Sequence, residues 1–481
     1  MLLHISMPNF SRRDFLKNTA LAGLTISLPE PAVYTGTPSK KKKIIVAGGG
    51  IAGLCTGYEL MKRGHDVTVM EASGRHGGHV FTVHDGLSDG LYGDGGAEHF
   101  TRPGYERYRE YVKELKLTAL PYPRRKNLLR QIKGKFYSEK MLADPGVLKQ
   151  LGFNEKEIEF LSRNPYGELP ALYLDAYLDK FTDEYQPFNV GYDDLDGVPM
   201  SDIYTKADAS DMAKSILGGN NISALFGLWQ AAILKLRGVA HFPLDIYRLK
   251  GGNQMLPNAF AKKLGSRVWL NCSIKSIQHD NSTIQVKYTH LNEEKELTAD
   301  YLVCCIPPPA FKNIPVSPAF SEAKQYVLNN ITYDSYQRFV FQASSKFWQQ
   351  DNTTINIDFE HPDLWSVWQC ADEVDTHRVI VLGTGPGGIS AQRALEAFRS
   401  SYPGKKDTIE QAIGKDWTKE TYAFTCERLA FPKGELRKFW PEVMAPAGRI
   451  YFAGAYADNL NWGMEASTRS AFRVAEQIDK A

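Results

Sequence analysis

Residues 43–71 read KIIVAGGGIAGLCTGYELMKRGHDVTVME and decide the fold of the chain. The apolar run at residues 44–47 has the composition of a buried parallel strand. Three glycines at the spacing Gly-x-Gly-x-x-Gly follow, then a helical stretch over residues 54–63, and a second apolar strand over residues 67–70 that stops at Glu71. Strand, glycines, helix, strand and acid stand in the order of the dinucleotide-binding fingerprint. The sequence therefore predicts an α/β fold with a dinucleotide site.

Each glycine of the fingerprint has its own physical role. Gly48 permits the tight turn from strand to helix, Gly50 lets a pyrophosphate approach the backbone, and Gly53 lets helix and strand pack closely. The helix N-terminus offers free N–H groups and a partial positive charge to phosphates. Glu71 is placed to accept hydrogen bonds from ribose hydroxyls. The alternative is a glycine-rich turn with no ligand.

The residues after Glu71, ASGRHGGH at 72–79, indicate which dinucleotide binds. Arg75 can hold phosphate or ribose oxygens, and Gly77-Gly78 lets the backbone pass close to a flat ring system. With the fingerprint, this E-A-x-x-R-x-G-G pattern resembles the flavin-containing amine oxidases, which include monoamine, polyamine and L-amino-acid oxidases, with carotenoid desaturases as relatives. The resemblance implies FAD and a discontinuous Rossmann-type FAD-binding domain with an inserted α+β substrate domain. The family usually has Arg where this chain has His79.

Three later segments resemble stretches that lie against FAD in the family. GDGGAEHF at residues 93–100 resembles the D-x-G-A segment near the flavin ring, GRIYFAGAY at 448–456 resembles G-R-I-x-F-A-G-E, and WGMEAS at 462–467 resembles G-Y-M-E-G-A. His99 is a candidate pocket residue, with a structural histidine as an equal alternative. The resemblance implies as cofactor-binding residues Gly48, Gly50, Ile51, Ala52, Gly53, Glu71, Ala72, Arg75, Gly77, Gly78, His79, Gly96, Ala97, Glu98, Ile274, Gly454, Ala455, Gly463, Met464 and Ala466.

The second half of the chain carries the candidate catalytic residues, Arg338 and Trp462. In family oxidases a lysine stands nine residues before the Phe of an F-W pair, holds a water against flavin N5 and is linked to oxygen reactivity. That position here is Arg338, before Phe347-Trp348, and arginine keeps the charge but cannot act as a base. The aromatic residue of the family's substrate cage aligns with Gly463, so Trp462, one residue earlier, is the candidate substitute.

The export motif and the family resemblance together imply six segments. Residues 268–270, 273–277, 283–288 and 296–297 alternate like a system of hairpins. Aromatic residues between 125 and 240 are expected in the core, with lining of an apolar pocket as the alternative. The predicted segments are a twin-arginine signal and linker at 1–40, FAD-binding pieces at 41–124, 241–310 and 441–481, and substrate-domain pieces at 125–240, largely helical, and 311–440.

Residues 11–17, SRRDFLK, match the twin-arginine export signal residue for residue. The apolar stretch that follows, residues 19–28, is too short to span a membrane comfortably. The twin-arginine route exports folded proteins, which suits a cofactor inserted before export. The motif predicts a periplasmic protein, and the absence of a clean A-x-A site before Lys40 leaves an uncleaved signal that attaches the protein to the membrane as an alternative. An ordinary amphipathic helix is the other alternative.

Composition excludes several classes of function. A length of 481 residues predicts two or more domains. The net charge of +2 gives no electrostatic reason to expect binding to nucleic acid or an anionic membrane. The sequence contains no run of 18 apolar residues, so no stable membrane span is predicted. None of the six cysteines forms a CxxC pair, so neither a metal site nor a disulfide framework is predicted.

The resemblance therefore implies an FAD-dependent oxidoreductase acting on a small molecule, an amine in the leading hypothesis. It would transfer a hydride from the carbon next to nitrogen to flavin N5, as an amine or amino-acid oxidase or dehydrogenase. One alternative is a flavin-dependent desaturase or isomerase of apolar C–C bonds, and another is a non-catalytic flavin-binding accessory protein. The sequence does not decide the oligomeric state, and a homodimer is one possibility.

Overall fold

The computed structural model describes residues 40–350, 353–370, 372–424, 427–428, 431–459 and 463–481. The chain divides into two units, residues 1–40 and 41–481, and the second contains every element described below. The twin-arginine motif at residues 11–17 and the candidate Trp462 lie outside the described residues. Within the described residues, no helix is long and apolar enough to cross a membrane.

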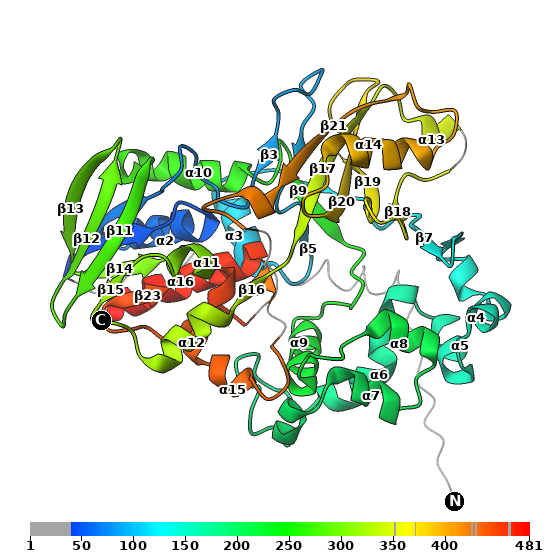
Figure 1. Cartoon of the computed structure of the whole chain (residues 1–481), viewed down its shortest axis with the longest axis horizontal. Helices are drawn as coiled ribbons and strands as arrows, with labels where there is room; N and C mark the ends of the chain where they lie inside the picture. Colours follow the sequence, from blue (N-terminus) through cyan, green and yellow to red (C-terminus); the bar gives the residue numbers. More distant parts are fainter. Residues whose placement is uncertain (1–39, 351–352, 371, 425–426, 429–430, 460–462) are drawn as a thin grey trace, which may run out of the picture. The chain divides into compact units, whose positions relative to one another are not determined.

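A five-stranded parallel sheet forms the centre of the cofactor-binding part (Figure 1). Every neighbouring pair in this sheet is parallel, so each strand must come from a separate stretch of the chain. In spatial order the strands are β10 (Val268–Trp269), β2 (Asp66–Met70), β1 (Lys43–Ala47), β14 (Tyr301–Cys304) and β23 (Ile450–Phe452).

Both faces of this sheet are covered, which explains the uninterrupted apolar run in β1. Ile44 and Val46 pack in the cluster of the covering helices α2 (Ile51–Lys62), α10 (Met255–Leu264) and α16 (Gly463–Lys480). Ile45 and Ala47 point the other way, toward an antiparallel sheet. That four-stranded sheet has the order β13 (Glu293–Ala299), β12 (Ile284–His290), β11 (Cys272–His279) and β15 (Val316–Ser317).

Helix and strand boundaries differ in places from those that the sequence predicted. Helix α2 begins at Ile51 rather than residue 54. Residues 268–269 do not join the hairpin system, because β10 pairs with β2 in parallel and Trp269 O accepts a 2.8 Å hydrogen bond from Glu71 N. Only β11, β12 and β13 form the predicted antiparallel hairpins.

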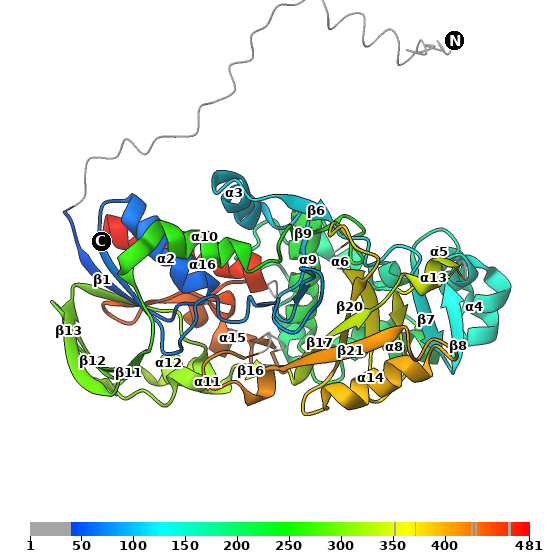
Figure 2. The same ribbon diagram turned by 90° about the horizontal axis from the view of Figure 1, so that it is seen from above.

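A second, seven-stranded sheet brings together segments that are far apart in the sequence (Figure 2). Along its strand β17 (Tyr336–Ala343), Phe339 and Phe341 pack in the hydrophobic cluster that contains α14 (Ala391–Ser400), whereas Val340 packs in the cluster on the opposite face. Arg338 shares the face of Val340 because side chains alternate along a strand. The strands are, in order, β21 (Ile409–Asp416), β17 (Tyr336–Ala343), β20 (Val379–Pro386), β19 (Ser366–Cys370), β18 (Ile357–Asp358), β7 (Leu129–Ile132) and β8 (Lys135–Ser138).

A group of helices fills most of residues 145–236 (Figure 1). Their aromatic side chains Tyr166, Tyr173, Tyr177, Tyr185 and Phe188 pack in or against the core, and none of them lines the cavity described below. The alternative pocket role for these residues is therefore wrong. The helices are α4 (Pro145–Leu151), α5 (Glu155–Leu161), α6 (Leu169–Leu178), α7 (Met200–Lys206), α8 (Asp211–Leu217) and α9 (Ala224–Leu236).

A small three-stranded sheet holds the segment after residue 97, because β5 of that segment is one of its strands. Strand β9 (Ile246–Leu249) lies between β5 (Phe100–Thr101) and β6 (Ala119–Pro121) and is antiparallel to both. Helix α3 (Glu106–Glu114) packs on α16. The residues just before β5 are thereby fixed at the edge of the cofactor-binding part.

Candidate cofactor and active site

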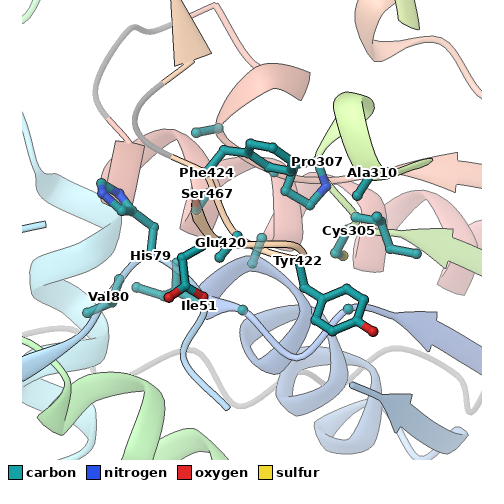
Figure 3. A pocket seen from close by; sticks show the side chains of 18 of the residues that line it. Ile51, His79, Val80, Cys305, Pro307, Ala310, Glu420, Tyr422, Phe424 and Ser467 are labelled. Atoms are coloured by element: carbon teal, nitrogen blue, oxygen red, sulfur yellow. The ribbon is translucent and has the colours of Figure 1, made fainter. Parts of the chain in front are cut away.

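A cavity of about 700 Å³ opens beyond the carboxyl ends of β1 and β14, where ligands bind in open parallel sheets. Gly48, which follows β1, and Cys305, which follows β14, both line it. Figure 3 shows the side chains of Glu420, Tyr422 and Phe424 projecting from one loop beside residues of other segments. The cavity is therefore built from parts of the chain far apart in sequence.

The glycine turn has the geometry that the fingerprint requires. Gly48 has φ +105°, and its N–H donates to Met70 O at 2.8 Å. A Cβ at Gly53 would lie 1.8 Å from Gly48 O, so no other residue fits there. A Cβ at Gly50 would meet only Gly78 Cα, at 3.9 Å, and would project into space that the cavity leaves open.

The carboxylate of Glu71 fixes the turn from the end of β2. Its Oε2 accepts a 2.7 Å hydrogen bond from Gly49 N, and its Oε1 accepts from the backbone N and the hydroxyl of Ser73 at 2.8 and 2.7 Å. Glu71 is buried and lines the cavity. Oε1 already accepts two hydrogen bonds, but Oε2 accepts only one and has a further lone pair, so the residue can still accept from a ligand hydroxyl.

Arg75 lines the cavity, and its guanidinium also forms a hydrogen bond within its own loop. One N–H of its guanidinium donates to Gly78 O at 2.9 Å, and the group lies over the ring of Phe81, 4.9 Å from its centroid. Burial lowers the pKa of Arg75, although the nearby carboxylates Glu420 and Glu71 act against that shift. The remaining guanidinium N–H groups are the ones that can serve a phosphate or ribose.

His79, at the position where the family usually has arginine, is a neutral residue. Burial, then the charge of Arg338, lowers the pKa of His79 to about 3. Its ring lies edge-on to that of Trp417, with 4.5 Å between centroids, and its buried Nε2 has no hydrogen-bond partner among the described residues. Because His79 lines the cavity, this atom is a polar group that a ligand can satisfy.

Glu98 and His99 form a polar pair on the cavity wall, in the segment before β5. Glu98 Oε1 is 2.7 Å from His99 Nδ1 and also accepts from Arg124 Nη1. Burial raises the pKa of Glu98, but Arg124 and then His99 outweigh it, so the pKa lies well below its usual range. Glu98 Oε2 is buried without a hydrogen-bond partner in the part of the chain that the structure describes. An ionised carboxylate thus presents one unused oxygen.

Arg338 reaches the same cavity from β17. The residue is only 8% exposed, and its buried Nε has no hydrogen-bond partner in the described segments of the chain. Among the described residues no carboxylate lies within ion-pair distance of its guanidinium. The guanidinium instead lies over the rings of Trp368 and Tyr336, at 5.2 and 5.7 Å from their centroids. A buried cation without a counter-ion is costly unless a ligand interacts with it.

The family model for flavin-containing amine oxidoreductases matches residues 51–479. The chain belongs to this family. L-amino-acid oxidases of Bungarus fasciatus and Notechis scutatus scutatus are 25% and 24% identical over 476 and 482 residues, which cover 92% of this chain and 88% of each relative. Putrescine oxidase bound to putrescine has a similar fold, with a TM-score of 0.76 and 19% identity over 92% of this chain and all of the other. Cyclohexylamine oxidase from Brevibacterium oxydans IH-35A gives 0.75 and 19%, over 92% and 99%.

Membership of the flavin-containing amine oxidoreductase family confirms three predictions. The protein is an FAD-dependent oxidoreductase of the amine oxidase type, and its α/β fold consists of a Rossmann-type FAD-binding domain with a substrate domain. The geometry fits FAD: the cavity leaves room at Gly50, the N-terminus of α2 has no side-chain cap, and His79 Nε2 lacks a partner. When bound, FAD supplies an acceptor for a hydride.

The structure brings most of the predicted site residues to this one cavity. It is lined by Gly48, Gly50, Ile51, Ala52, Glu71, Ala72, Arg75, Gly78, His79, Ala97, Glu98, Ile274, Arg338, Gly454, Ala455, Gly463 and Met464. Four others stand behind the wall. A Cβ at Gly96 would lie 1.8 Å from His79 O, Gly77 N donates to Gly49 O at 2.9 Å, Gly53 supports the turn, and Ala466 is buried in α16.

Some lining residues were missed by the sequence predictions. They include the loop 420–424, Tyr333 before β17, Tyr336 at the start of β17, and Arg124 before β7. Ser273 and Lys275 flank the predicted Ile274. The family motifs contain none of these positions, and no spacing rule connects residues 420–424 to the glycine turn. Only the folded chain places them together.

Proposed function

We propose that this protein oxidises a small amine or amino acid by removing a hydride from the carbon bound to nitrogen. The observation that carries the proposal is that the glycine turn and the charged residues Glu98 and Arg338 line one cavity. Loss of hydride leaves an imine, and water hydrolyses the imine to a carbonyl compound and ammonia or a smaller amine. The relatives named as L-amino-acid, putrescine and cyclohexylamine oxidases support this choice of substrate class.

The polar groups of the cavity favour a nitrogen compound over an apolar hydrocarbon. Glu98 Oε2 and Arg338 Nε are both buried and have no hydrogen-bond partners within the described residues. A hydrocarbon would leave both unpaired, at a cost of about 1–3 kcal/mol for each neutral group and more for a charged one. An amine can donate to the carboxylate oxygen. We therefore place the desaturase alternative second.

We propose further that oxygen is a slow electron acceptor and that the protein works as a dehydrogenase. The support is Arg338, which stands where family oxidases have the lysine linked to oxygen reactivity. Arginine is planar, keeps its charge and does not exchange protons with a water at neutral pH. An artificial acceptor should therefore raise turnover.

We also propose that the protein is exported in its folded state by the twin-arginine route and acts in the periplasm. The support is the sequence of residues 11–17. Attachment through an uncleaved signal, the bounds of the six predicted segments and a homodimer stay predictions. Fractionation of cells would test the periplasmic location, and the mass of the exported chain would test whether the signal is cleaved.

The proposed function is tested by mixing the oxidised flavoprotein, without oxygen, with separate amines, L-amino acids and unsaturated lipids. Loss of the flavin absorption bands with an amine or amino acid, together with release of a carbonyl compound, is the expected result. Bleaching or double-bond rearrangement with the lipids alone would favour the desaturase or isomerase. A flavoprotein that reacts with none of these compounds would favour the accessory protein.

A further inference from the structure

Glu98 fixes the protonation of His99 on the cavity wall. A carboxylate can only accept, so the 2.7 Å contact between Glu98 Oε1 and His99 Nδ1 requires the hydrogen on Nδ1. Arg124 Nη1 also lies 3.4 Å from Nδ1, but two facing lone pairs at 2.7 Å would repel, so the carboxylate contact decides the tautomer. The Nε2 of a neutral His99 then carries a free lone pair.

His99 can use that lone pair on a ligand. Its side chain is 26% exposed, it lines the cavity, and no hydrogen bond to its Nε2 occurs within the described part of the chain. Burial is the largest influence and lowers the pKa of His99; Glu98 raises it, and Arg124 and Arg125 lower it further. The ring is therefore neutral near pH 7, which a proton acceptor must be.

Glu98 itself is a poor base, because its pKa lies well below the usual range for the reasons given above. Its role is to accept a hydrogen bond from His99 Nδ1, which fixes the orientation and the tautomer of the imidazole. Arg124 holds it from the other side and lies over the ring of Trp368, with 4.0 Å between the guanidinium carbon and the centroid. The carboxylate is thus fixed between a cation and an imidazole, as in other sites where an acid selects the tautomer of a histidine.

The pair lies at the end of the cavity that also holds Arg338. Arg124 and Arg338 both lie over Trp368, and the charge of Arg338 contributes to the lowered pKa of Glu98. By its place in the sequence, Arg338 stands where the family resemblance implies a lysine that holds a water against flavin N5. His99 therefore belongs to the reacting end of the cavity and not to the phosphate end at Gly48 and Gly50.

We propose that His99 is a catalytic base that takes a proton from the ammonium group of the substrate, with Glu98 as its positioning residue. This inference rests on the proposed function. In the step, one N–H bond of the ammonium breaks and its electron pair stays on nitrogen, while an N–H bond forms at His99 Nε2. The freed pair is required before hydride leaves the neighbouring carbon, because it becomes the second bond of the C=N group.

The unused oxygen of Glu98 completes the arrangement. Glu98 Oε2 is buried, has no hydrogen-bond partner among the residues that the structure describes, and belongs to a residue that lines the cavity. After deprotonation, the amine still has two N–H groups, and one of them can donate to this oxygen. The pair thus accepts a proton through His99 and holds the resulting amine through Glu98.

The first test replaces the base and varies the acidity of the substrate. For His99→Gln, flavin reduction by an ordinary amine at pH 7 should slow by about 100-fold, the lower end for loss of a general base. The loss should shrink as pH approaches the amine's own pKa, should be small for an electron-poor fluorinated amine, and should be partly reversed by added imidazole. His84→Gln, the same change at an exposed histidine outside the cavity, is the matched control and should have no effect.

A second measurement does not depend on turnover. The ¹⁵N shifts of the imidazole that disappears in His99→Gln should show hydrogen on Nδ1 in the wild type, and Glu98→Leu should abolish that preference. Unchanged flavin content and melting temperature would show that both variants fold. A loss for His99→Gln that is equal at every pH and for every amine, or a hydrogen on Nε2 in the wild type, would overturn the inference. If no amine bleaches the wild-type flavin at any pH, the proposed function fails first.

Discussion

The guanidinium of Arg338 lies over the ring of Trp368, with 5.2 Å between the guanidinium carbon and the ring centroid. Trp368 is buried in β19, and its indole N–H donates to Tyr122 Oη, so the surface under the cation is rigid. Cation–π contact of this kind contributes about 0.5–2 kcal/mol. The contact with Trp368 compensates in part for the absence of a counter-ion among the described residues. The charge of Arg338 can still interact with a ligand in the cavity.

Arg338→Lys should raise the rate at which reduced flavin reacts with oxygen by about 10-fold, which needs only about 1.4 kcal/mol of barrier. The physical reason is that a shorter ammonium can hold a water where the planar guanidinium fills the space. Stopped-flow reoxidation of the chemically reduced protein measures it. Arg393→Lys, at an exposed ion pair with Asp363, is the control. Equal rates for wild type and Arg338→Lys would remove Arg338 from the oxygen reaction.

Gly50→Val should abolish FAD binding without unfolding the protein. Gly50 has φ −69°, which valine accepts, and its Cβ would project into the open cavity. The purified variant should be colourless, whereas Gly197→Val, at an exposed glycine with no neighbour within 4 Å, should stay yellow. Absorbance at the flavin bands, with FAD identified by mass after heat release, gives the answer. A yellow Gly50→Val protein would contradict the assignment of the pyrophosphate to this turn.

Changing Arg12 and Arg13 together to lysine should retain the protein in the cytoplasm, because the twin-arginine pathway recognises the pair of guanidinium groups. Immunoblots of periplasmic and cytoplasmic fractions measure the distribution. Changing Lys41 and Lys42 together to arginine keeps the same total charge and serves as a control. Normal export of the protein with both arginines replaced would mean that residues 11–17 are not a twin-arginine signal.

Phe341→Ala should lower the free energy of unfolding by about 3–5 kcal/mol. Phe341 is fully buried between β17 and α14, with 4.8 Å between its ring centroid and that of Phe398. The same change at Phe136, which is 43% exposed, should cost less than about 1 kcal/mol. Denaturant unfolding followed by tryptophan fluorescence compares the two. Similar losses at both positions would contradict the packing of the seven-stranded sheet on α14.

Lys324 should make stability depend on pH in the alkaline range. Its ammonium is buried and donates to Ala445 O at 2.7 Å, and burial lowers its pKa from 10.5 to about 8, although Glu442 acts against the shift. Between these two values the unfolded chain binds more protons, so the contribution of Lys324 to stability rises with pH, by at most about 3 kcal/mol. The difference in unfolding free energy between wild type and Lys324→Met should therefore change steadily from pH 8 to pH 10, in favour of the wild type. A difference that is constant over this range would show an unshifted lysine.

The sequence by itself determined the cofactor-binding half of the protein. Residues 43–71 specify a strand, a glycine turn, a helix and a second strand through local rules, namely strand and helix periodicity and the steric demands at Gly48 and Gly53. These rules act over a few residues. The class of fold and a dinucleotide site could therefore be predicted before any contact between distant residues was known, and the family resemblance that continues through residues 71–78 implied FAD.

Only the tertiary structure decided the reacting end of the cavity. Glu98 receives its counter-ion from Arg124, 26 residues away, and shares its surroundings with Arg338 on β17. The loop 420–424 and Tyr336 reach the same cavity, whereas the aromatic residues of the helical region pack in the core. Charge, burial and protonation at such a site depend on which distant segments pack together, and side-chain type and spacing along the chain do not contain that information.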